Sequence, residues 1–582
     1  MLRNACALLL LAGLVAVTAC GNGNGSSGNP NGTVTISQTA ATVGVNQTVQ
    51  FSATVAGMPS TGVDWEVNGT PGGDAAHGLI SATGMFTAPA SVPSPNTVLV
   101  TAVSQADSSK SAFAVVTVAP AAFSNASLNG RYAFSFSGRN SSGFLAEAGS
   151  FIADGNGNLT SGVEDVNSGG GIFQNVSFTG AYSIGADGRG SASLQTSVGA
   201  ALWQFSMVNS NHALLIRFDS GVVTASGSID KQTPSSFATS LVSGNYVFSF
   251  SGINSGESLL LMAGQLVANG AGSFTSGILD VNDVGTVTPA VALSGTYSIS
   301  STGRGSASLF SQSGTFSALS FAFYVVDSTH LKFVELDTLP VVSGDLLQQA
   351  NGPFNNSSLN GSFAFTLGGV SSTGSLGLGG VFSSAGNGTI SAGGVVDIND
   401  DGTVTSNVAV NTSSYSVDNI TGRGTATLIL NNGQTLKLAF YPAANGTVQL
   451  LETDAIFSTS GQAFAQSGGP FGNQALVGSF AVNFNGVVLN TGLEEDIAGQ
   501  VAGDQGGRVG GALDINNSLS TSSASADGTF SVSQNGRGTL NLNVPFVNAA
   551  FDLNTYTIDN NTTLILDVDN SRVLVGVMQR QF

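Results

Sequence analysis

The stretch Leu128-Asn129-Gly130-Arg131-Tyr132-Ala133-Phe134-Ser135-Phe136 decides the fold, because large apolar residues alternate in it with small or polar ones. Alternation with a period of two places every second side chain on one face of a β-strand, so its aromatic residues face a core. The same pattern opens again at Val242, Leu359 and Leu476. The chain therefore contains a repeated unit that begins with a half-buried strand.

Each copy of the unit carries the same later signatures. A D-[VI]-N segment is followed by a Y/F-S strand, a G-R-G turn, a late strand ending in aspartate and a closing glutamine, and the D-[VI]-N aspartates lie 115, 117 and 117 residues apart. Even spacing of this length predicts tandem domains rather than propeller blades or solenoid coils. We place the four repeats at 121–236, 237–350, 351–467 and 468–582.

About eight short strands can be counted in each repeat, with Gly, Asn and Ser at the turns and no helical periodicity. The chain is therefore predicted to be all-β. An even number of sequential antiparallel strands can pair first to last, which favours small eight-stranded up-and-down barrels without exposed edges. A β-sandwich for each repeat is the alternative. The G-x-Y/F opening strand and the single arginine loosely resemble the calycin barrels, although no diagnostic calycin motif is present.

Only three charged positions recur in all four repeats, in a chain that is 8% charged. They are Asp165, Arg189 and Asp219; Asp280, Arg304 and Asp337; Asp397, Arg423 and Asp454; and Asp514, Arg537 and Asp569. We favour a structural role, in which each arginine is held by the carboxylates of its own repeat at one end of the barrel. Arg304 and Asp280 would form one such pair. The functional alternative is a polar site for an anionic or carbohydrate ligand.

Residues 33–120 form a separate segment of short alternating strands around one tryptophan, Trp65. The segment Gly78–Pro89 reads G-L-I-S-A-T-G-M-F-T-A-P, and V-x-V strands close the region. It resembles the bacterial immunoglobulin-like domains of surface proteins and adhesins. The resemblance implies a β-sandwich with a spacer or adhesive role.

The first twenty residues indicate export. Arg3 precedes an apolar run of about a dozen residues, too short to span a bilayer and typical of a signal peptide. The run ends in Val17-Thr18-Ala19-Cys20, which resembles the lipobox of bacterial lipoproteins. The resemblance implies cleavage before Cys20, diacylglycerol on its sulfur and, since residue 21 is Gly, an outer-membrane location. Residues 21–32 are predicted to be a flexible Gly/Asn/Ser tether.

Composition excludes several functions. With 15 Lys+Arg against 34 Asp+Glu, a net charge of −19 argues against nucleic acid as a partner. Asp397, Asn399 and Asp401 have the opening spacing of a calcium loop, but Val408 stands where the loop's glutamate belongs. We regard them as a weak calcium candidate only, and expect neither a metal nor a cofactor. With three His, and two Cys that both precede residue 21, the sequence offers no candidates for zinc or thiol chemistry, and its Ser residues lack a nucleophile-elbow context.

The sequence thus predicts a membrane-anchored, exported lipoprotein at the cell surface or the periplasmic face of the outer membrane. Its expected role is structural, adhesive or multivalent binding of a surface protein or carbohydrate, since four linked copies can raise avidity. Binding of a small apolar or carbohydrate ligand by the barrels is the alternative. A carboxylate-based hydrolase is a third and weaker one, so the chain is not expected to be an enzyme.

Overall fold

The computed structural model describes residues 32–44, 47–89, 93, 95–119, 123–169, 171–197, 199–219, 221, 223–312, 318–504, 506–545 and 549–582. Cys20, the signal segment and all but the last residue of the predicted tether lie outside these residues. The chain divides into two compact units, of which the second holds residues 119–582 together with 43–49. The two are described separately.

The N-terminal unit is built from short strands in three small sheets. A two-stranded sheet pairs β1 with β4, a five-stranded sheet has the order β2-β11-β10-β5-β6, and a four-stranded sheet has the order β3-β9-β8-β7. Trp65 is buried at 6% exposure, as the alternation of its strand predicts. The strands are β1 (Thr33–Ile36), β2 (Ala40–Gly44), β3 (Thr48–Gln50), β4 (Ala53–Ala56), β5 (Val63–Val67), β6 (Thr70–Pro71), β7 (Gly73–Asp74), β8 (Gly78–Ile80), β9 (Met85–Thr87), β10 (Thr97–Ser104) and β11 (Ser111–Ala119).

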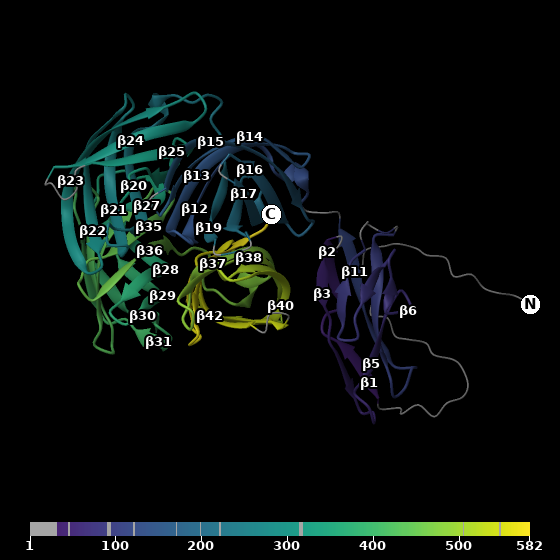
Figure 1. The fold of residues 1–582 in the computed structure, drawn as a ribbon. Helices are drawn as coiled ribbons and strands as arrows, with labels where there is room; N and C mark the ends of the chain where they lie inside the picture. The colour runs from purple at the N-terminus through teal and green to yellow at the C-terminus, as the bar shows by residue number, and fades with distance from the viewer. Residues whose placement is uncertain are drawn as a thin grey trace, which may run out of the picture. The chain divides into compact units, whose positions relative to one another are not determined.

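The remainder of the chain forms four closed antiparallel barrels in tandem, so the barrel prediction is confirmed and the sandwich alternative is wrong (Figure 1). Each barrel lies within one of the four predicted repeats, and a short 3₁₀ helix precedes its first strand. Barrel 1 comprises Asn125–Ser127, then β12 (Asn129–Asn140), β13 (Gly143–Asp154), β14 (Asn158–Ser168), β15 (Gly171–Ile184), β16 (Arg189–Thr196), β17 (Gly199–Asn209), β18 (His212–Arg217) and β19 (Thr224–Lys231). Barrel 2 comprises Thr239–Leu241, then β20 (Ser243–Ile253), β21 (Leu259–Asn269), β22 (Ser273–Asp283), β23 (Thr286–Ile299), β24 (Arg304–Ser311), β25 (Leu319–Asp327), β26 (His330–Glu335) and β27 (Val341–Gln348).

Barrels 3 and 4 repeat this order with one local change. Barrel 3 comprises Asn356–Ser358, then β28 (Asn360–Ser371), β29 (Ser375–Ala385), β30 (Thr389–Asp400), β31 (Thr403–Ala409), β32 (Ser413–Val417), β33 (Gly424–Ile429), β34 (Thr435–Pro442), β35 (Thr447–Glu452) and β36 (Phe457–Ala465). Its fourth strand is thus divided into β31 and β32, and the pairing of β29 with β30 completes the closure. Barrel 4 comprises Asn473–Leu476, then β37 (Gly478–Val488), β38 (Leu493–Gly503), β39 (Arg508–Asn516), β40 (Thr521–Val532), β41 (Arg537–Val544), β42 (Ala549–Thr557), β43 (Thr562–Asp567) and β44 (Arg572–Arg580).

The opening strands close the barrels and fill their interiors. In barrel 1, β12 pairs with both β13 and β19, so the first and last strands meet and leave no edge. Its alternate residues Tyr132, Phe134 and Phe136 are at most 2% exposed and belong to the barrel's core, where the two Phe rings pack against Trp203. Equivalent apolar clusters occupy the other three barrels. Aromatic side chains in the alternating pattern therefore explain why each repeat forms a filled barrel.

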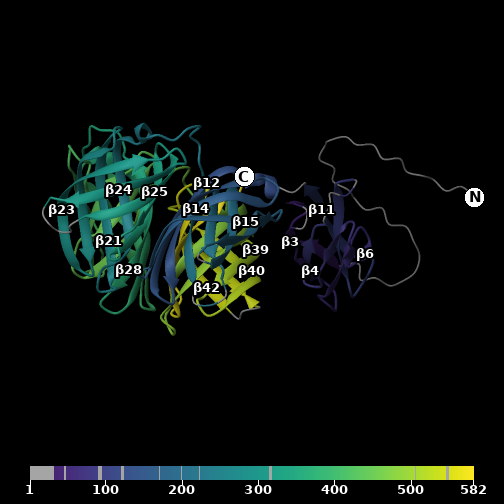
Figure 2. The same cartoon turned by 45° about the horizontal axis from the view of Figure 1, so that its top comes forward.

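The four barrels contact one another in a closed cycle. Strands one and two of each barrel pack against strands six to eight of the next, as with β13 of barrel 1 and β25–β27 of barrel 2. The cycle ends where β37 and β38 of barrel 4 meet β17–β19 of barrel 1. Figures 1 and 2 show barrel 4, in yellow, lying beside barrel 1, in blue, although their sequences are far apart. We refer to this assembly as the ring, and to the contact of barrels 4 and 1 as the closing interface.

Candidate functional site: polar contacts between the barrels

The shared arginine of one repeat is paired with the shared aspartate of the repeat before it. Arg304 of barrel 2 donates from Nε and Nη2 to the two carboxylate oxygens of Asp165 in barrel 1, at 2.7 and 2.8 Å. This fork-to-fork geometry is the strong, orienting form of a charge-assisted hydrogen bond. The carboxylate is fully buried and the arginine side chain is 17% exposed. The equivalent pairs are Arg423 with Asp280, at 2.7 Å for both bonds, and Arg537 with Asp397, at 2.8 Å for both.

These pairs correct the expected partner of the arginine. The sequence predicted that Arg304 would be held by Asp280 of its own repeat, but Asp280 binds Arg423 of the following barrel. The sequence could not distinguish the two arrangements, because an Arg–Asp pair within one repeat and a pair between two repeats use the same residue types. The arginine therefore joins barrels rather than closing one.

At each interface between barrels that are consecutive in the sequence, a tyrosine donates a further hydrogen bond to the same aspartate, and this contact was not predicted from the sequence. The hydroxyl of Tyr324 donates to Asp165 at 2.6 Å, Tyr556 donates to Asp397 at 2.7 Å, and Tyr441 donates to Asp280. Burial, together with the neighbouring carboxylate, raises the pKa of the Tyr324 hydroxyl well above its usual value, so it stays a donor. The hydrogen bond to Asp165 in turn raises the pKa of Arg304.

A backbone amide supplies a further donor to the same aspartates. The N–H groups of Asn175, Ala290 and Asn407 donate to Asp165, Asp280 and Asp397 at 3.1, 2.9 and 2.7 Å. All three donors have positive φ, between 54° and 61°, and the paired strands shift register beside them. A bulge in the fourth strand therefore turns one amide toward the carboxylate.

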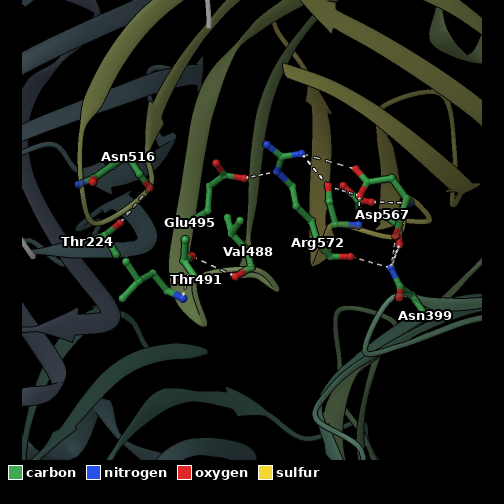
Figure 3. A network of polar contacts seen from close by, with 11 residues as sticks. Thr224, Asn399, Val488, Thr491, Glu495, Asn516, Asp567 and Arg572 are labelled. Carbon is green, nitrogen blue, oxygen red and sulfur yellow. Dashed lines mark hydrogen bonds and ion pairs between the residues drawn. The ribbon is translucent and has the colours of Figure 1, made fainter. Parts of the chain in front are cut away.

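The asparagine of the D-[VI]-N segment and the closing glutamine also bridge neighbouring barrels. Asn282 donates to the backbone carbonyls of Glu452 and Phe457 at 2.9 and 3.2 Å. The same contact is made by Asn167 to Glu335 and Asp337, by Asn399 to Asp567, Asp569 and Arg572, and by Asn516 to Arg217 and Val223. Figure 3 shows Asn399 reaching the chain around Asp567. The glutamines Gln232, Gln349, Gln466 and Gln581 donate to carbonyls of the next barrel, Gln581 returning to Asp187 and Met207 of barrel 1.

The late-strand aspartates lie apart from these ion pairs. Asp337 accepts from the backbone N–H of Ser320 at 2.7 Å, and Asp454 accepts from that of Ile456 at 2.9 Å. Asp569 accepts from Ser571, while Asp219 holds Arg217 and the N–H of Leu202. Each therefore fixes a loop of its own barrel.

The calcium candidate does not form a cluster. Asp397 is occupied by Arg537, Tyr556 and the Asn407 amide, and the amide of Asn399 faces barrel 4. Within the described residues no three His, Cys, Asp or Glu side chains group as metal ligands.

Buried carboxyl groups inside barrel 1 were also missed. Glu147 and Glu164, each 3% exposed, share a hydrogen bond, and Arg217 donates to Glu147 at 3.1 Å. Burial, with the adjoining Glu147, raises the pKa of Glu164 to about 10, so this carboxyl is protonated at neutral pH. The other barrels have apolar residues at these inward positions, for example Met262 and Leu279 in barrel 2. This polar cluster is therefore particular to the first barrel.

Two cavities in the described part of the chain bear on ligand binding. The interior of barrel 3 holds about 20 Å³ lined only by apolar residues, including Phe365, Phe382 and Phe440, which is the space of roughly one water molecule. A polar cavity of about 350 Å³ lies at the junction of barrels 3 and 4, and its lining includes Ser362, Ser383, Gln466, Gln534 and Asn535. Only the second approaches the size of a small-molecule site.

Comparisons with known proteins add little to this geometry. No protein-family model and no curated protein matches the chain. Among solved structures, isotype 1 transferrin-binding protein B from serogroup B Neisseria meningitidis aligns with 10% identity and a TM-score of 0.17, covering 64% of this chain and 84% of that one. The alcaligin outer-membrane receptor FauA from Bordetella pertussis aligns with 8% identity and a TM-score of 0.10, covering 83% and 81%. Similarity at this level carries no argument about function. Among the described residues, no helix is long and apolar enough to cross a membrane.

Proposed function

We propose that this chain is an exported lipoprotein, anchored through Cys20, that presents a ring of barrels with a structural, adhesive or binding role at the bacterial surface. The observation that carries the proposal is the use of the repeated polar residues. Asp280, Asn282 and Arg423 and their equivalents hold barrel to barrel, so these repeated residues serve assembly. The proposed export and anchor rest on the signal-peptide pattern and lipobox of the first twenty residues.

A carbohydrate-binding role is a second candidate, favoured by the polar cavity at the junction of barrels 3 and 4. Its lining offers hydroxyl and amide groups without a charged side chain, which suits a neutral polar ligand such as a sugar. Binding of an apolar ligand inside barrel 3 is disfavoured, because about 20 Å³ admits no such molecule. We propose no enzymatic role, since the carboxyl pair of barrel 1 is buried at 3% exposure and out of reach of a substrate.

Cell fractionation and mass spectrometry of the mature N-terminus test the anchor. We expect a diacylated Cys20 in the outer-membrane fraction, and release of a Cys20→Ala variant from that fraction. A free Cys20 thiol, or equal membrane retention of the variant, contradicts the proposal.

Screening the full chain against arrayed glycans and surface proteins tests binding, with Ala392→Trp as the matched variant because Ala392 lines the polar cavity and is exposed. Glycan binding that the tryptophan abolishes supports the second candidate. Binding that survives it places adhesion elsewhere on the ring.

A further inference from the structure

The closing interface differs from the other three because no linker crosses it. Barrels 1 and 2 are joined through residues 232–242, whereas barrel 4 meets barrel 1 through non-covalent contacts alone, among them those of β37 and β38 with β17–β19. Nothing in the covalent chain therefore requires these two faces to belong to the same molecule.

The ion pair of the closing interface is the weakest of the four. Arg189 reaches Asp514 through Nη1 alone, at 3.4 and 3.5 Å, and its Nε is held by Asp187. The strand position of Tyr324 is occupied by Ser206, because Arg189 pairs with Ser206 as Arg304 pairs with Tyr324. The Ser206 hydroxyl is buried and has no hydrogen-bond partner among the residues that the structure describes. Two of the donors that secure the other aspartates are thus weakened or absent.

The apolar contact is also smaller. At the closing interface the buried apolar cluster is Val208, Leu214 and Ala481, with Val577 packed against it. Nine buried residues form the corresponding cluster between barrels 1 and 2, seven between barrels 2 and 3, and six between barrels 3 and 4. Less apolar surface is therefore removed from water here.

A carboxyl group is buried in this interface where the other interfaces carry Ala146, Leu261 or Gly377. Asp496 of barrel 4 is fully buried and accepts a hydrogen bond from the Thr224 hydroxyl of barrel 1, while its Oδ1 has no hydrogen-bond partner in the described part of the chain. Figure 3 shows Thr224 meeting barrel 4 at Asn516. An ionised carboxylate in this position is costly unless it is paired, and within the described residues no salt bridge reaches Asp496.

The charged groups around Asp496 can be named strand by strand. Its own strand carries Glu494 and Glu495, and β17 and β37 carry none. The other neighbouring strands carry His212 and Arg217 on β18, Asp230 and Lys231 on β19, Arg508 and Asp514 on β39, and Arg131 and Arg139 on β12. Burial, reinforced by Glu495, raises the pKa of Asp496 to about 7. The proton that Asp496 keeps therefore stabilises the closed interface below neutral pH.

We propose that the ring opens at the closing interface and that the two faces it exposes bind the same faces of a second copy of this chain, head to tail. A second copy is the expected partner, because the two faces already bind each other in the closed ring. Barrel 4 would present Asp514 and Asn516, and barrel 1 of the second copy would present Arg189 and the Arg217 carbonyl that Asn516 binds in the closed ring. A face that is complementary to a different face of the same molecule closes a ring or continues as a filament.

Opening should depend on pH in a defined direction. Burial raises the pKa of Asp496 only in the closed state, whereas in the open state Asp496 has its ordinary pKa of 3.8. Between these two values the closed state therefore binds a proton that the open state has released. Closure is fully stabilised near pH 4, weakens as pH rises toward 7, and is constant above it. The shift corresponds to a change in the opening equilibrium of at most about 10³-fold.

Sedimentation velocity at several concentrations, at pH 5 and pH 8, tests the proposal on the full chain carrying Cys20→Ser. We expect closed monomers at pH 5 and concentration-dependent dimers and longer species at pH 8. Asp496→Asn should remain monomeric at both pH values. If the Asn variant misfolds, Asp496→Ala replaces it, because alanine stands at the equivalent position 146 of barrel 1. Glu335→Gln is the control, because Glu335 is a buried carboxyl inside barrel 2, away from this interface.

Three results overturn the proposal. They are a wild-type chain that is monomeric at both pH values and all concentrations, an Asp496→Asn chain that associates as strongly as the wild type at pH 8, and an association that Glu335→Gln abolishes equally. Loss of association in Asp496→Asn alone supports it.

Discussion

Arg304 and Asp165 stand 139 residues apart in the chain, in different barrels, and are joined by two parallel hydrogen bonds of 2.7 and 2.8 Å. Arg423 with Asp280 and Arg537 with Asp397 repeat the relationship at separations of 143 and 140 residues. Each repeat therefore supplies an arginine to the repeat before it and an aspartate to the repeat after it. This reciprocity explains why a chain with so few charges keeps these charges in every copy.

Replacing Arg304 by methionine should destabilise the chain by about 3 kcal/mol, because Asp165 would remain buried without its cation. Arg189→Met at the closing interface should cost less than about 1 kcal/mol, since its contact is longer and partly exposed. Denaturant unfolding followed by the fluorescence of Trp203, in the core of barrel 1, measures both variants in a Trp65→Phe background. A loss for Arg304→Met below half a kcal/mol, or equal losses for the two variants, argues against the cross-barrel pair as a main contact.

Tyr441→Phe should cost about 2 kcal/mol, because a buried hydroxyl that donates to the Asp280 carboxylate is removed. A double-mutant cycle with Asp280→Asn should give a coupling energy of at least about 1 kcal/mol. Tyr246→Phe is the matched control, because the Tyr246 hydroxyl bonds to Ser328 within barrel 2, so its coupling to Asp280→Asn should be close to zero. Additive effects of Tyr441→Phe and Asp280→Asn contradict the prediction.

Asn399→Ala should cost about 2 kcal/mol, because three backbone carbonyls of barrel 4 lose their donor. Asn387→Ala, in an exposed hairpin turn of the same barrel, removes one local contact to Thr389 and should cost less than about 1 kcal/mol. Calorimetric unfolding of the two variants compares them directly. Equal melting temperatures of the two variants would show that the inter-barrel hydrogen bonds of Asn399 stabilise the protein no more than the turn hydrogen bond of Asn387.

The free energy of unfolding should fall as pH rises, and Glu335→Gln should make this fall smaller. Burial, together with Asp337, raises the pKa of Glu335 to about 10, whereas the unfolded chain releases this proton near pH 4.5. The folded state therefore binds one more proton between these values, and stability declines with pH across that window by at most about 1.4 kcal/mol per unit. Unfolding free energies at pH 5, 7 and 9 should show a smaller decline in the glutamine variant. A parallel pH dependence of the two proteins would show that Glu335 is already ionised when folded.

The barrels could be predicted from the sequence because alternation, turn residues and repeat spacing are all local. The partner of Arg304 could not, because Asp280 in its own repeat and Asp165 in the previous one satisfy the same sequence pattern. Tyr324 was overlooked because an aromatic residue within a strand looks like core, and because Ser206 breaks the pattern in the first repeat. Asp496 gave no repeat signal, since it departs from the small or apolar residues at the equivalent positions. What makes the closing interface distinctive is thus a set of departures from the repeat, which only the assembled ring reveals.

The closed ring itself is tested most directly by a disulfide across the closing interface. The Ser226 hydroxyl of barrel 1 donates to the Asn483 side chain of barrel 4 at 2.8 Å, although 257 residues separate them. In a Cys20→Ser background, Ser226→Cys combined with Asn483→Cys should form a bond within one chain under mild oxidation, seen as a reducible shift on electrophoresis and as a linked peptide pair. Barrels that are connected only by their linkers would leave these two thiols far apart, and failure to recover that peptide pair from a folded double variant would contradict the ring.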